Sequence, residues 1–382
     1  MGFYVGEAEA AALRKYQYKG ADNSIMYRLA LSPLAAALVE FLPRWVAPNV
    51  VTLLGLMCSV SAHVVTLLFV DGEDLSGAMP RWCYVFCALA VFAYQTLDNM
   101  DGKQARRTGT SSPLGLLFDH GIDAVNVTVT ALTVGACLRV GQGSGMFALW
   151  ATTLLAFGFA TWEEYWVGEL NLGVFNGPSE GLLMSVALML SQAVFGPQFM
   201  LTRVITYTAG EEEGALLVKD LVVIAMVVSC AVQLCINVAN VLAFLKRTRK
   251  QRHTPAALFM LTPFLFMFAC GAVIFSGVGG LDQEHTRLVL YSLGLLFCNV
   301  ACKLMLAHLT ASTFRAVRLS MLPHALFLLN LWLDKPLVEP LQLLRAAGFA
   351  CFVLYAHLVI YGIADITKAL GIKCLSIPYK RD

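Results

Sequence analysis

The chain has 382 residues, of which 58% are hydrophobic and only 14% are charged, and its mean hydropathy is +0.69. A soluble core of this size does not need so much apolar sequence, so a soluble domain is excluded and an integral membrane protein is expected. The net charge of +2 and the lack of interleaved basic and aromatic residues give no reason to expect a nucleic-acid partner, and eleven cysteines, mostly inside apolar runs, predict no disulfide framework.

Residues 1–47 form a first segment that is polar and charged at its start and mixes apolar positions with Lys, Arg, Tyr and Trp. This mixture predicts an interfacial amphipathic helix on the cytoplasmic leaflet, with a disordered tail as the alternative. Pro43, Trp45 and Pro48 mark an abrupt entry into the membrane and favour the helix.

Ten apolar segments follow, most of them about 18 to 25 residues long, which is the length that a helix needs to cross roughly 30 Å of hydrocarbon. They are apolar on nearly every face, whereas the strands of a β-barrel would alternate. The fold class is therefore all-α: a polytopic membrane helix bundle of about ten transmembrane helices in residues 48–366, with a cytoplasmic tail at 367–382. The expected spans are 50–71, 82–97, 119–137, 146–167, 181–203, 215–245, 256–278, 287–308, 321–333 and 341–365.

Charge is distributed unevenly between alternate loops. One side receives the basic stretches KQARR, KRTRKQRH, RAVR and YKRD, and the other receives DGEDLSG, AGEEEGA and GLDQEH. Because Lys and Arg remain in short cytoplasmic loops, both termini and the charged stretch at 98–123 are expected on the cytoplasmic side.

That stretch carries two pairs of aspartates at helical spacing. Asp98 and Asp101 are three residues apart at the end of one span, and Asp119 and Asp123 are four apart at the start of the next. A short loop joins the two spans, so the pairs can converge at the membrane surface. Four carboxylates repel one another, and two Mg²⁺ or Mn²⁺ ions would compensate them while leaving positions open for phosphate oxygens. The alternative is a charged loop whose aspartates only cap helices and pair with arginines.

Cations and small residues lie between these pairs. Lys103, Arg106 and Arg107 can meet further negative charge on a phosphorylated substrate. Gly102 and Ala105 leave room for a phosphate or sugar to approach the backbone.

The pattern Dx2DGx2ARx8Gx3Dx3D, from Asp98 to Asp123, resembles the complete signature of the CDP-alcohol phosphotransferases. Residues 47–55, 94–107, 111–121 and 303–310 are similar to the eukaryotic choline and ethanolamine phosphotransferase branch. The resemblance implies a ten-helix membrane enzyme that transfers phosphoethanolamine or phosphocholine from CDP-ethanolamine or CDP-choline to diacylglycerol and releases CMP. It also implies an endoplasmic reticulum location, with the Golgi as an alternative, contact with membrane lipids, and a homodimer as in many members.

The resemblance also implies roles for individual residues. Asp98, Asp101, Asp119 and Asp123 would be the metal ligands, and Gly102, Ala105 and Arg106 would face the nucleotide. Asn49 matches a family position near the CDP-alcohol, although an Asn after a Pro can equally be a helix N-cap.

His120 is the candidate base for the acceptor hydroxyl, because its unperturbed pKa is near 6.5 and it matches the base proposed in this branch. Asp123 is the alternative candidate for the base, because the matching residue is assigned that role in bacterial members of the wider family. Metal coordination would lower the basicity of Asp123. His308 also matches the family, and it is either near the acceptor or structural.

The head group is expected near residues 160–170, where aromatic faces and a carboxylate, Glu163, could hold an ammonium. An aromatic belt at the membrane surface is the alternative. The acidic pair Glu163 and Glu164 favours ethanolamine, because a primary ammonium donates hydrogen bonds that quaternary choline cannot.

Two other functions remain as alternatives. A related transferase could use another acceptor, such as inositol, but the branch-specific segments argue against it. A transporter would typically show inverted repeats and charges near the bilayer midplane, and the sequence shows neither.

Overall fold

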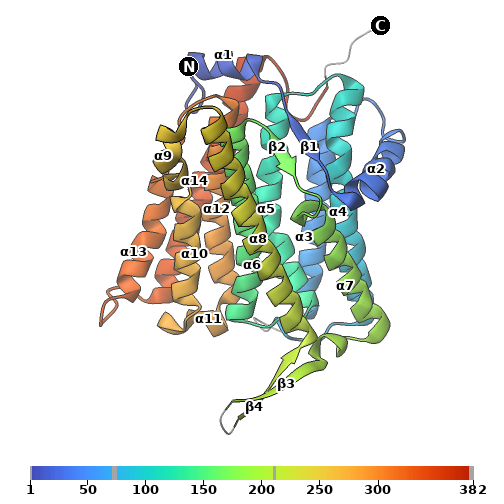
Figure 1. Cartoon of the computed structure of the whole chain (residues 1–382), viewed down its shortest axis with the longest axis vertical. Coiled ribbons are helices and arrows are strands. Elements are labelled where there is room, and N and C mark those ends of the chain that lie inside the picture. The colour runs from blue at the N-terminus through green and yellow to red at the C-terminus, as the bar shows by residue number, and fades with distance from the viewer. Residues whose placement is uncertain (1, 71–74, 210–211, 378–382) are drawn as a thin grey trace.

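A computed structural model describes residues 2–70, 75–209 and 212–377. A helix lies in each of the ten predicted segments, and the helices run side by side as one bundle (Figure 1). Seven helical stretches in the described part are long and apolar enough to cross a membrane. The predicted all-α fold is confirmed. The bundle helices are α3 (Pro48–Phe69), α4 (Arg81–Thr108), α5 (Pro113–Cys137), α6 (Ser144–Val167), α7 (Leu182–Phe195), α8 (Val218–Arg247), α10 (Thr262–Ile274), α12 (Thr286–Leu309), α13 (Leu322–Leu331) and α14 (Pro340–Leu370).

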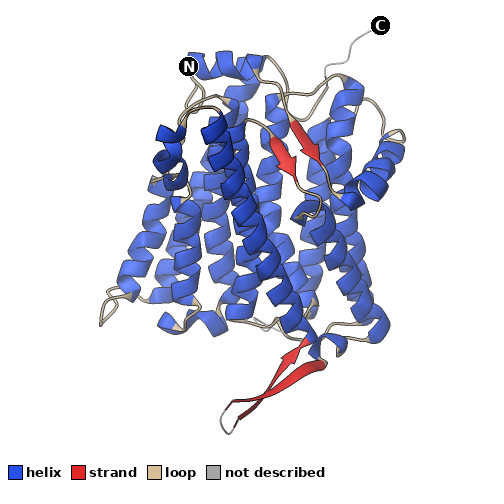
Figure 2. Cartoon of the chain, in the orientation of Figure 1, coloured by secondary structure: helices blue, strands red, loops and turns tan. Residues whose placement is uncertain are grey.

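The other elements are short and lie mostly at the two ends of the bundle (Figure 2). Two-stranded pairings are the only sheets in the described residues: β1 with β2 in parallel, and β3 with β4 antiparallel. The short elements are α1 (Glu7–Lys15), α2 (Ser32–Val39), α9 (Thr254–Phe259), α11 (Leu281–Glu284), β1 (Gly20–Asp22), β2 (Leu170–Leu172), β3 (Arg203–Ala209), β4 (Glu212–Leu217), π-helical turns at Tyr27–Leu31 and Gly177–Gly181, and 3₁₀ turns at Phe199–Leu201, Gln251–His253, Val278–Gly280 and Leu319–Met321.

The charged stretch at 98–123 is two helix ends joined by a tight turn. Helix α4 continues to Thr108 instead of ending at 97, and Gly109 stops it in the left-handed conformation, φ 64°. Helix α5 begins at Pro113 instead of 119, because the Ser112 side chain accepts a hydrogen bond from the backbone N–H of Gly115 at 3.1 Å. The aspartates therefore lie on regular helix, which fixes the direction of each side chain.

The N-terminal segment contains two helices where we expected one. Strand β1 separates α1 from α2 and pairs with β2, which follows α6. The Asp22 carboxylate accepts a hydrogen bond from Ser179 at 2.7 Å, and Glu180 accepts one from Ser24 at 2.6 Å. These bonds interrupt the helical pattern and hold the segment across the end of the bundle.

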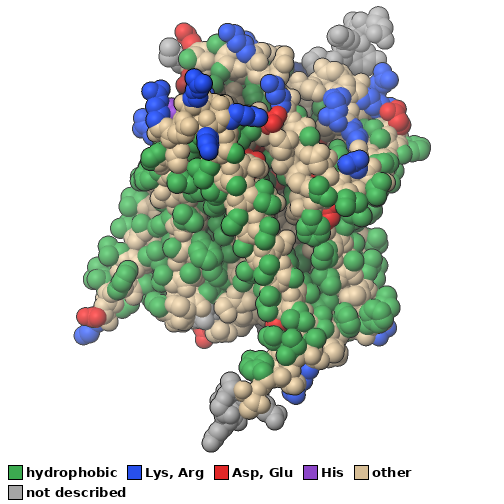
Figure 3. Space-filling view, viewed as in Figure 1, with side chains coloured by type: hydrophobic (Ala, Val, Ile, Leu, Met, Phe, Trp, Pro, Cys, Tyr) green, Lys and Arg blue, Asp and Glu red, His purple; other side chains and the backbone are tan. Residues whose placement is uncertain are grey.

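Lys and Arg side chains gather at the end of the bundle that carries α1 and α9, whereas α11 and the β3–β4 hairpin lie at the other end (Figures 1 and 3). The first and last helices meet at the basic end, where Arg14 donates to the carbonyl of Ala369 at 2.9 Å. The basic stretches of the predicted charge sorting thus gather at one end, whereas the YKRD tail and the acidic side chains of DGEDLSG lie outside the described residues.

The bundle helices differ in how much of their apolar sequence is buried inside the protein. In the apolar stretch of α12, 78% of the residues are buried inside the protein, whereas in that of α8 the share is 6%. A helix that is apolar all round and yet exposed faces lipid. Helix α12 is thus the centre of the bundle, and α8 lies at its edge.

Candidate active site

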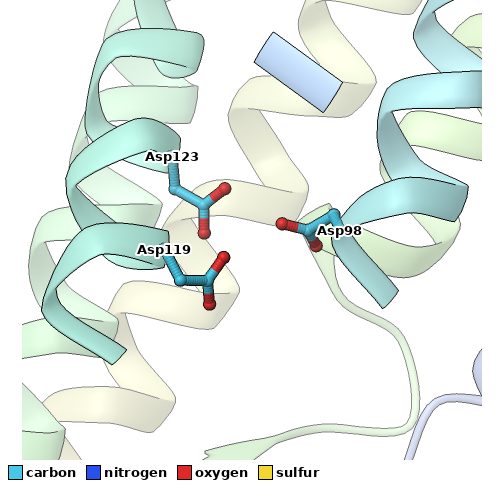
Figure 4. Close-up of side chains that lie close together, drawn as sticks. All are labelled: Asp98, Asp119 and Asp123. Atoms are coloured by element: carbon cyan, nitrogen blue, oxygen red, sulfur yellow. The ribbon is translucent and has the colours of Figure 1, made fainter. Parts of the chain in front are cut away.

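Three of the four predicted aspartates come together at the basic end of the bundle. Asp98 projects from α4 toward Asp119 and Asp123, which lie one turn apart on α5 (Figure 4). One carboxylate oxygen from each lies within 4.8 Å of the other two. The spacing of four residues places Asp119 and Asp123 on one face, as the sequence predicted.

Asp101, the fourth predicted ligand, is turned toward α3. Its Oδ2 accepts a hydrogen bond from the Thr52 hydroxyl at 2.6 Å, and its side chain is buried. Asp123 is held in a similar way, because the Tyr94 hydroxyl donates to its Oδ1 at 2.6 Å. Hydroxyl groups of the neighbouring helices thus fix the orientation of both carboxylates.

The carboxylate cluster lacks compensating charge from the chain. No Lys or Arg forms a salt bridge with Asp98, Asp119 or Asp123 in the described part of the protein. Oδ1 of Asp119 is buried and has no hydrogen-bond partner there. Close carboxylate oxygens without a cationic side chain fit a hard divalent cation, which prefers oxygen ligands.

The three cations beside the site have different surroundings. Lys103 donates to the Ser32 hydroxyl at 2.9 Å and Arg107 to the carbonyl of Leu42 at 2.6 Å, so both hold α2 against α4. Arg106 is exposed. It is the cation of this group that is free to meet a substrate.

Small residues leave space along the same part of α4. A methyl group added at Gly102 would meet only the end of the Arg106 side chain, at 3.6 Å. Ala105 is half-buried one turn further on. The surface between the aspartates and Arg106 can therefore be approached closely.

Asn49 lies at the start of α3, next to the start of α5. It is not the helix cap, because Ala47 occupies that position. Its side-chain amide donates to the carbonyl of Cys374 at 2.9 Å, and a methyl group added at Gly115 would lie 3.7 Å from its Oδ1. The cap alternative is wrong, and the starts of α3 and α5 both border the site.

His120 follows Asp119 on α5, and one of its two ring nitrogens forms a hydrogen bond with the backbone. Its Nδ1 lies 3.1 Å from the carbonyl of Leu116, which can only accept, so Nδ1 carries the proton of the neutral ring. Its Nε2 lies 3.9 Å from Oε2 of Glu164 on α6. The lone pair of Nε2 is therefore available to take a proton.

Glu164, which the sequence named only as one of an acidic pair for the head group, lies beside His120 instead. Its side chain is 1% exposed, and neither oxygen has a hydrogen-bond partner among the described residues. Oε1 lies 3.8 Å from Nε2 of His308, which is 3.3 Å from the hydroxyl of Tyr16. A buried carboxylate thus lies between two histidines where α5, α6 and α12 meet.

Glu163, which the sequence assigned to the head group, faces the other way. Its two oxygens accept hydrogen bonds from Asn237 at 2.5 Å and Asn240 at 2.9 Å, both on α8. Trp162 is buried and donates to the carbonyl of Ala257 at 2.8 Å. The structure thus does not bring these two side chains to His120 or the aspartates.

The N-terminal segment reaches the same group of residues. Tyr18, just before β1, has its pKa raised to about 12, first by partial burial and then by the negative charges of Glu164 and Asp119. Tyr16 reaches His308, as described above. Only the folded chain reveals this contribution, since no motif links residues 16–18 to the aspartates.

Known proteins resemble this chain along its whole length. The family model described as CDP-alcohol phosphatidyltransferase matches residues 45–210. Choline/ethanolaminephosphotransferase 1 of Arabidopsis thaliana is 32% identical over 392 residues, covering 99% of both chains. Cholinephosphotransferase 1 of Saccharomyces cerevisiae is 30% identical over 406 residues, covering 100% of both.

The chain belongs to the CDP-alcohol phosphatidyltransferase family. Another relative, an uncharacterized class-I family protein of Dictyostelium discoideum, is 33% identical over 98% of this chain and 88% of its own. The family model spans α3 to α7 and strand β3, and hence all four aspartates, His120 and Glu164. The predicted family, the enzyme class and the membrane fold are confirmed.

Proposed function

We propose that this CDP-alcohol phosphatidyltransferase moves phosphoethanolamine or phosphocholine from the CDP-alcohol to diacylglycerol and releases CMP. The observation that carries the proposal is the convergence of Asp98, Asp119 and Asp123 beside His120 at the basic end of the bundle. Relatives named for this chemistry match the full length of the chain.

The donor would bind between α4 and α5. Asp98, Asp119 and Asp123 would hold Mg²⁺ or Mn²⁺, and Asp101 would turn from Thr52 to complete a site for a second ion. Such ions, when bound, neutralise charge on the pyrophosphate and stabilise the departing CMP. Arg106 would bind a phosphate oxygen, and the small side chains of Gly102 and Ala105 would let the nucleotide approach.

The proton of the acceptor would pass to His120. Because Nδ1 donates to Leu116, Nε2 can accept the hydroxyl proton of diacylglycerol while the oxygen attacks the head-group phosphorus. The bond from that phosphorus to CMP then breaks. Glu164 would stabilise the imidazolium that forms. Asp123 suits this step less well, because it accepts from Tyr94 and belongs to the carboxylate cluster.

The head group would not contact Glu163 in the arrangement seen in the structure. Glu163 would have to exchange its bonds to Asn237 and Asn240 to reach an ammonium. The head group would instead lie near Asn49 at the start of α3, the position that by family resemblance is near the CDP-alcohol.

The setting of the reaction follows from the family resemblance and the charge distribution. The basic end would face the cytoplasm in the endoplasmic reticulum or Golgi membrane, where soluble CDP-alcohol and membrane-bound diacylglycerol both arrive. The resemblance also supports a homodimer.

A reconstituted assay tests the reaction. Purified protein receives diacylglycerol, Mg²⁺ or Mn²⁺, and radiolabelled CDP-ethanolamine or CDP-choline. We expect labelled phospholipid and an equal amount of CMP, and the ratio between the two donors gives the head-group preference. Absence of product with both donors overturns the proposal.

A further inference from the structure

A separate pocket lies at the basic end of the molecule, between the end of α6, the start of α9 and the residues that follow α12. Its volume is about 650 Å³, within the usual range for small-ligand sites. None of its lining residues belongs to the carboxylate cluster or to the group of His120, Glu164 and His308. The pocket is therefore distinct from the candidate active site.

The charged groups around this pocket are all cationic. Lys250 and Arg315 line it together with His253, whose Nε2 accepts a hydrogen bond from Arg252 at 3.3 Å, and no Asp or Glu does so among the described residues. Neither Lys250 nor Arg315 forms a salt bridge in that part of the chain. Positive charge that is not paired within the protein attracts an anion.

Arg318 adds to this charge from beside the pocket. Its guanidinium lies 4.3 Å from the centre of the Phe314 ring, and Phe314 lines the pocket. Burial lowers the pKa of Arg318 to about 10, and the positive charge of Arg315 contributes. Its Nε is buried without a hydrogen-bond partner in the described chain.

The remaining walls are aromatic and apolar. Tyr165, Trp166, Phe259 and Met260 line the pocket, and the Tyr165 hydroxyl donates to the carbonyl of Ser312 at 3.0 Å. Phe259 is 57% exposed at the end of α9, immediately before the membrane helix α10. The pocket thus combines unpaired cations with apolar surface next to the membrane helix α10.

We propose that this pocket binds the anionic head group of a phospholipid, with its acyl chains along α9 and α10. Diacylglycerol carries no charge, so Lys250, Arg315 and Arg318 would give it no advantage. A zwitterionic phospholipid carries an ammonium that these cations repel. An anionic phospholipid satisfies both the cationic and the apolar lining.

Lipid retention tests this proposal without any donor or turnover, so its outcome is independent of the transferase assay. The full chain in detergent is incubated with phosphatidylglycerol or with phosphatidylcholine of the same acyl chains, and bound lipid is counted by native mass spectrometry. Inorganic phosphate serves as a competitor. We expect phosphatidylglycerol to bind roughly tenfold more tightly than phosphatidylcholine and to resist millimolar phosphate.

Three variants separate the pocket from general surface charge. Lys250→Gln with Arg315→Gln removes two lining cations, and Ala256→Phe fills the pocket without changing charge. The control, Lys246→Gln with Arg247→Gln, removes two exposed cations of the same basic stretch outside the lining. We expect the first two variants to lose about tenfold in phosphatidylglycerol binding and the control to retain it, each with an unchanged melting temperature.

Three results would overturn the proposal. An equal loss of phosphatidylglycerol binding in the control variant means that only surface charge attracts the lipid. Undiminished binding by Ala256→Phe places the lipid elsewhere. Displacement by inorganic phosphate identifies a site for free phosphate in place of a lipid.

Discussion

Oε2 of Glu164 lies 3.9 Å from Nε2 of His120, although the two residues come from different helices and neither oxygen of Glu164 has a hydrogen-bond partner among the described residues. The distance is too long for a direct hydrogen bond and leaves the two groups to interact through charge. An unpartnered buried carboxylate costs free energy, so its position calls for a functional reason. Stabilisation of a protonated His120 supplies one.

Replacing Glu164 with Gln is therefore expected to slow turnover. Gln has nearly the same size but cannot balance positive charge on the imidazolium, so kcat should fall by roughly 10- to 100-fold while the KM for the CDP-alcohol stays within about twofold. Steady-state kinetics with both substrates measure this split, and Glu164→Asp should recover part of kcat. Wild-type kcat in Glu164→Gln would show that the carboxylate has no part in the reaction.

His120→Ala is expected to abolish most turnover and to leave binding intact. Loss of a general base typically costs about 10²- to 10⁴-fold in rate. Titration of CDP-alcohol in the presence of Mg²⁺ should give an affinity close to that of the unaltered protein. The matched control is His357→Ala, because His357 contacts Tyr4 on the far side of α14 and not the aspartates. Near-normal kcat in His120→Ala would transfer the role of base to Asp123.

Much of this site could be predicted from the sequence, because the residues that form it are close together in the chain. The spacing of Asp119 and Asp123 determines that they share a face once α5 is a helix, and Ser112 and Gly109 carry the signals that place the helix ends. His120 is adjacent to these residues, so its neighbourhood follows from the same short stretch.

The rest depends on how distant segments pack. Consecutive residues on a helix point about 100° apart, so only one of Glu163 and Glu164 can face α5, and the rotation of α6 between α5 and α8 decides which. The sequence favoured Glu163, whereas the structure turns Glu164 toward His120. The contact of Asp101 with Thr52 likewise depends on α3, which lies far away in the sequence.

Asp98→Asn and Asp119→Asn are expected to remove metal-dependent nucleotide binding. Each change takes one charged oxygen donor from the cluster, and an amide is a poor ligand for Mg²⁺ by comparison. Calorimetric titration of CDP-alcohol with and without Mg²⁺ measures the effect. Asp220→Asn is the control, because Asp220 only accepts from the backbone of Leu217 at the opposite end of the bundle. Unchanged Mg²⁺-dependent binding in both site variants would sink the metal assignment.

Glu163→Gln tests the head-group contact that the sequence suggested. The structure gives this carboxylate two amide donors on α8, so its loss should weaken the packing of α8 on α6, costing about 1–3 kcal/mol. The ratio of activity with CDP-ethanolamine to that with CDP-choline should not change. A thermal melt and a two-donor assay on the same preparation measure both quantities. A shift in the ratio at unchanged stability would restore Glu163 as the head-group contact.

Arg106→Gln and Arg107→Gln are adjacent changes with different expected results. Arg106 is exposed beside the small residues of α4, so its loss should remove one charge-assisted bond to phosphate and raise the KM for the CDP-alcohol about tenfold. Arg107 donates to the carbonyls of Val39 and Leu42, so its loss should lower the melting temperature and leave KM unchanged. Its salt bridge with Glu40 should contribute little, because the Glu40 side chain is 67% exposed. Kinetics and thermal melts of the two variants give the comparison, and an equal rise in KM for both would mean that Arg106 does not bind the donor directly.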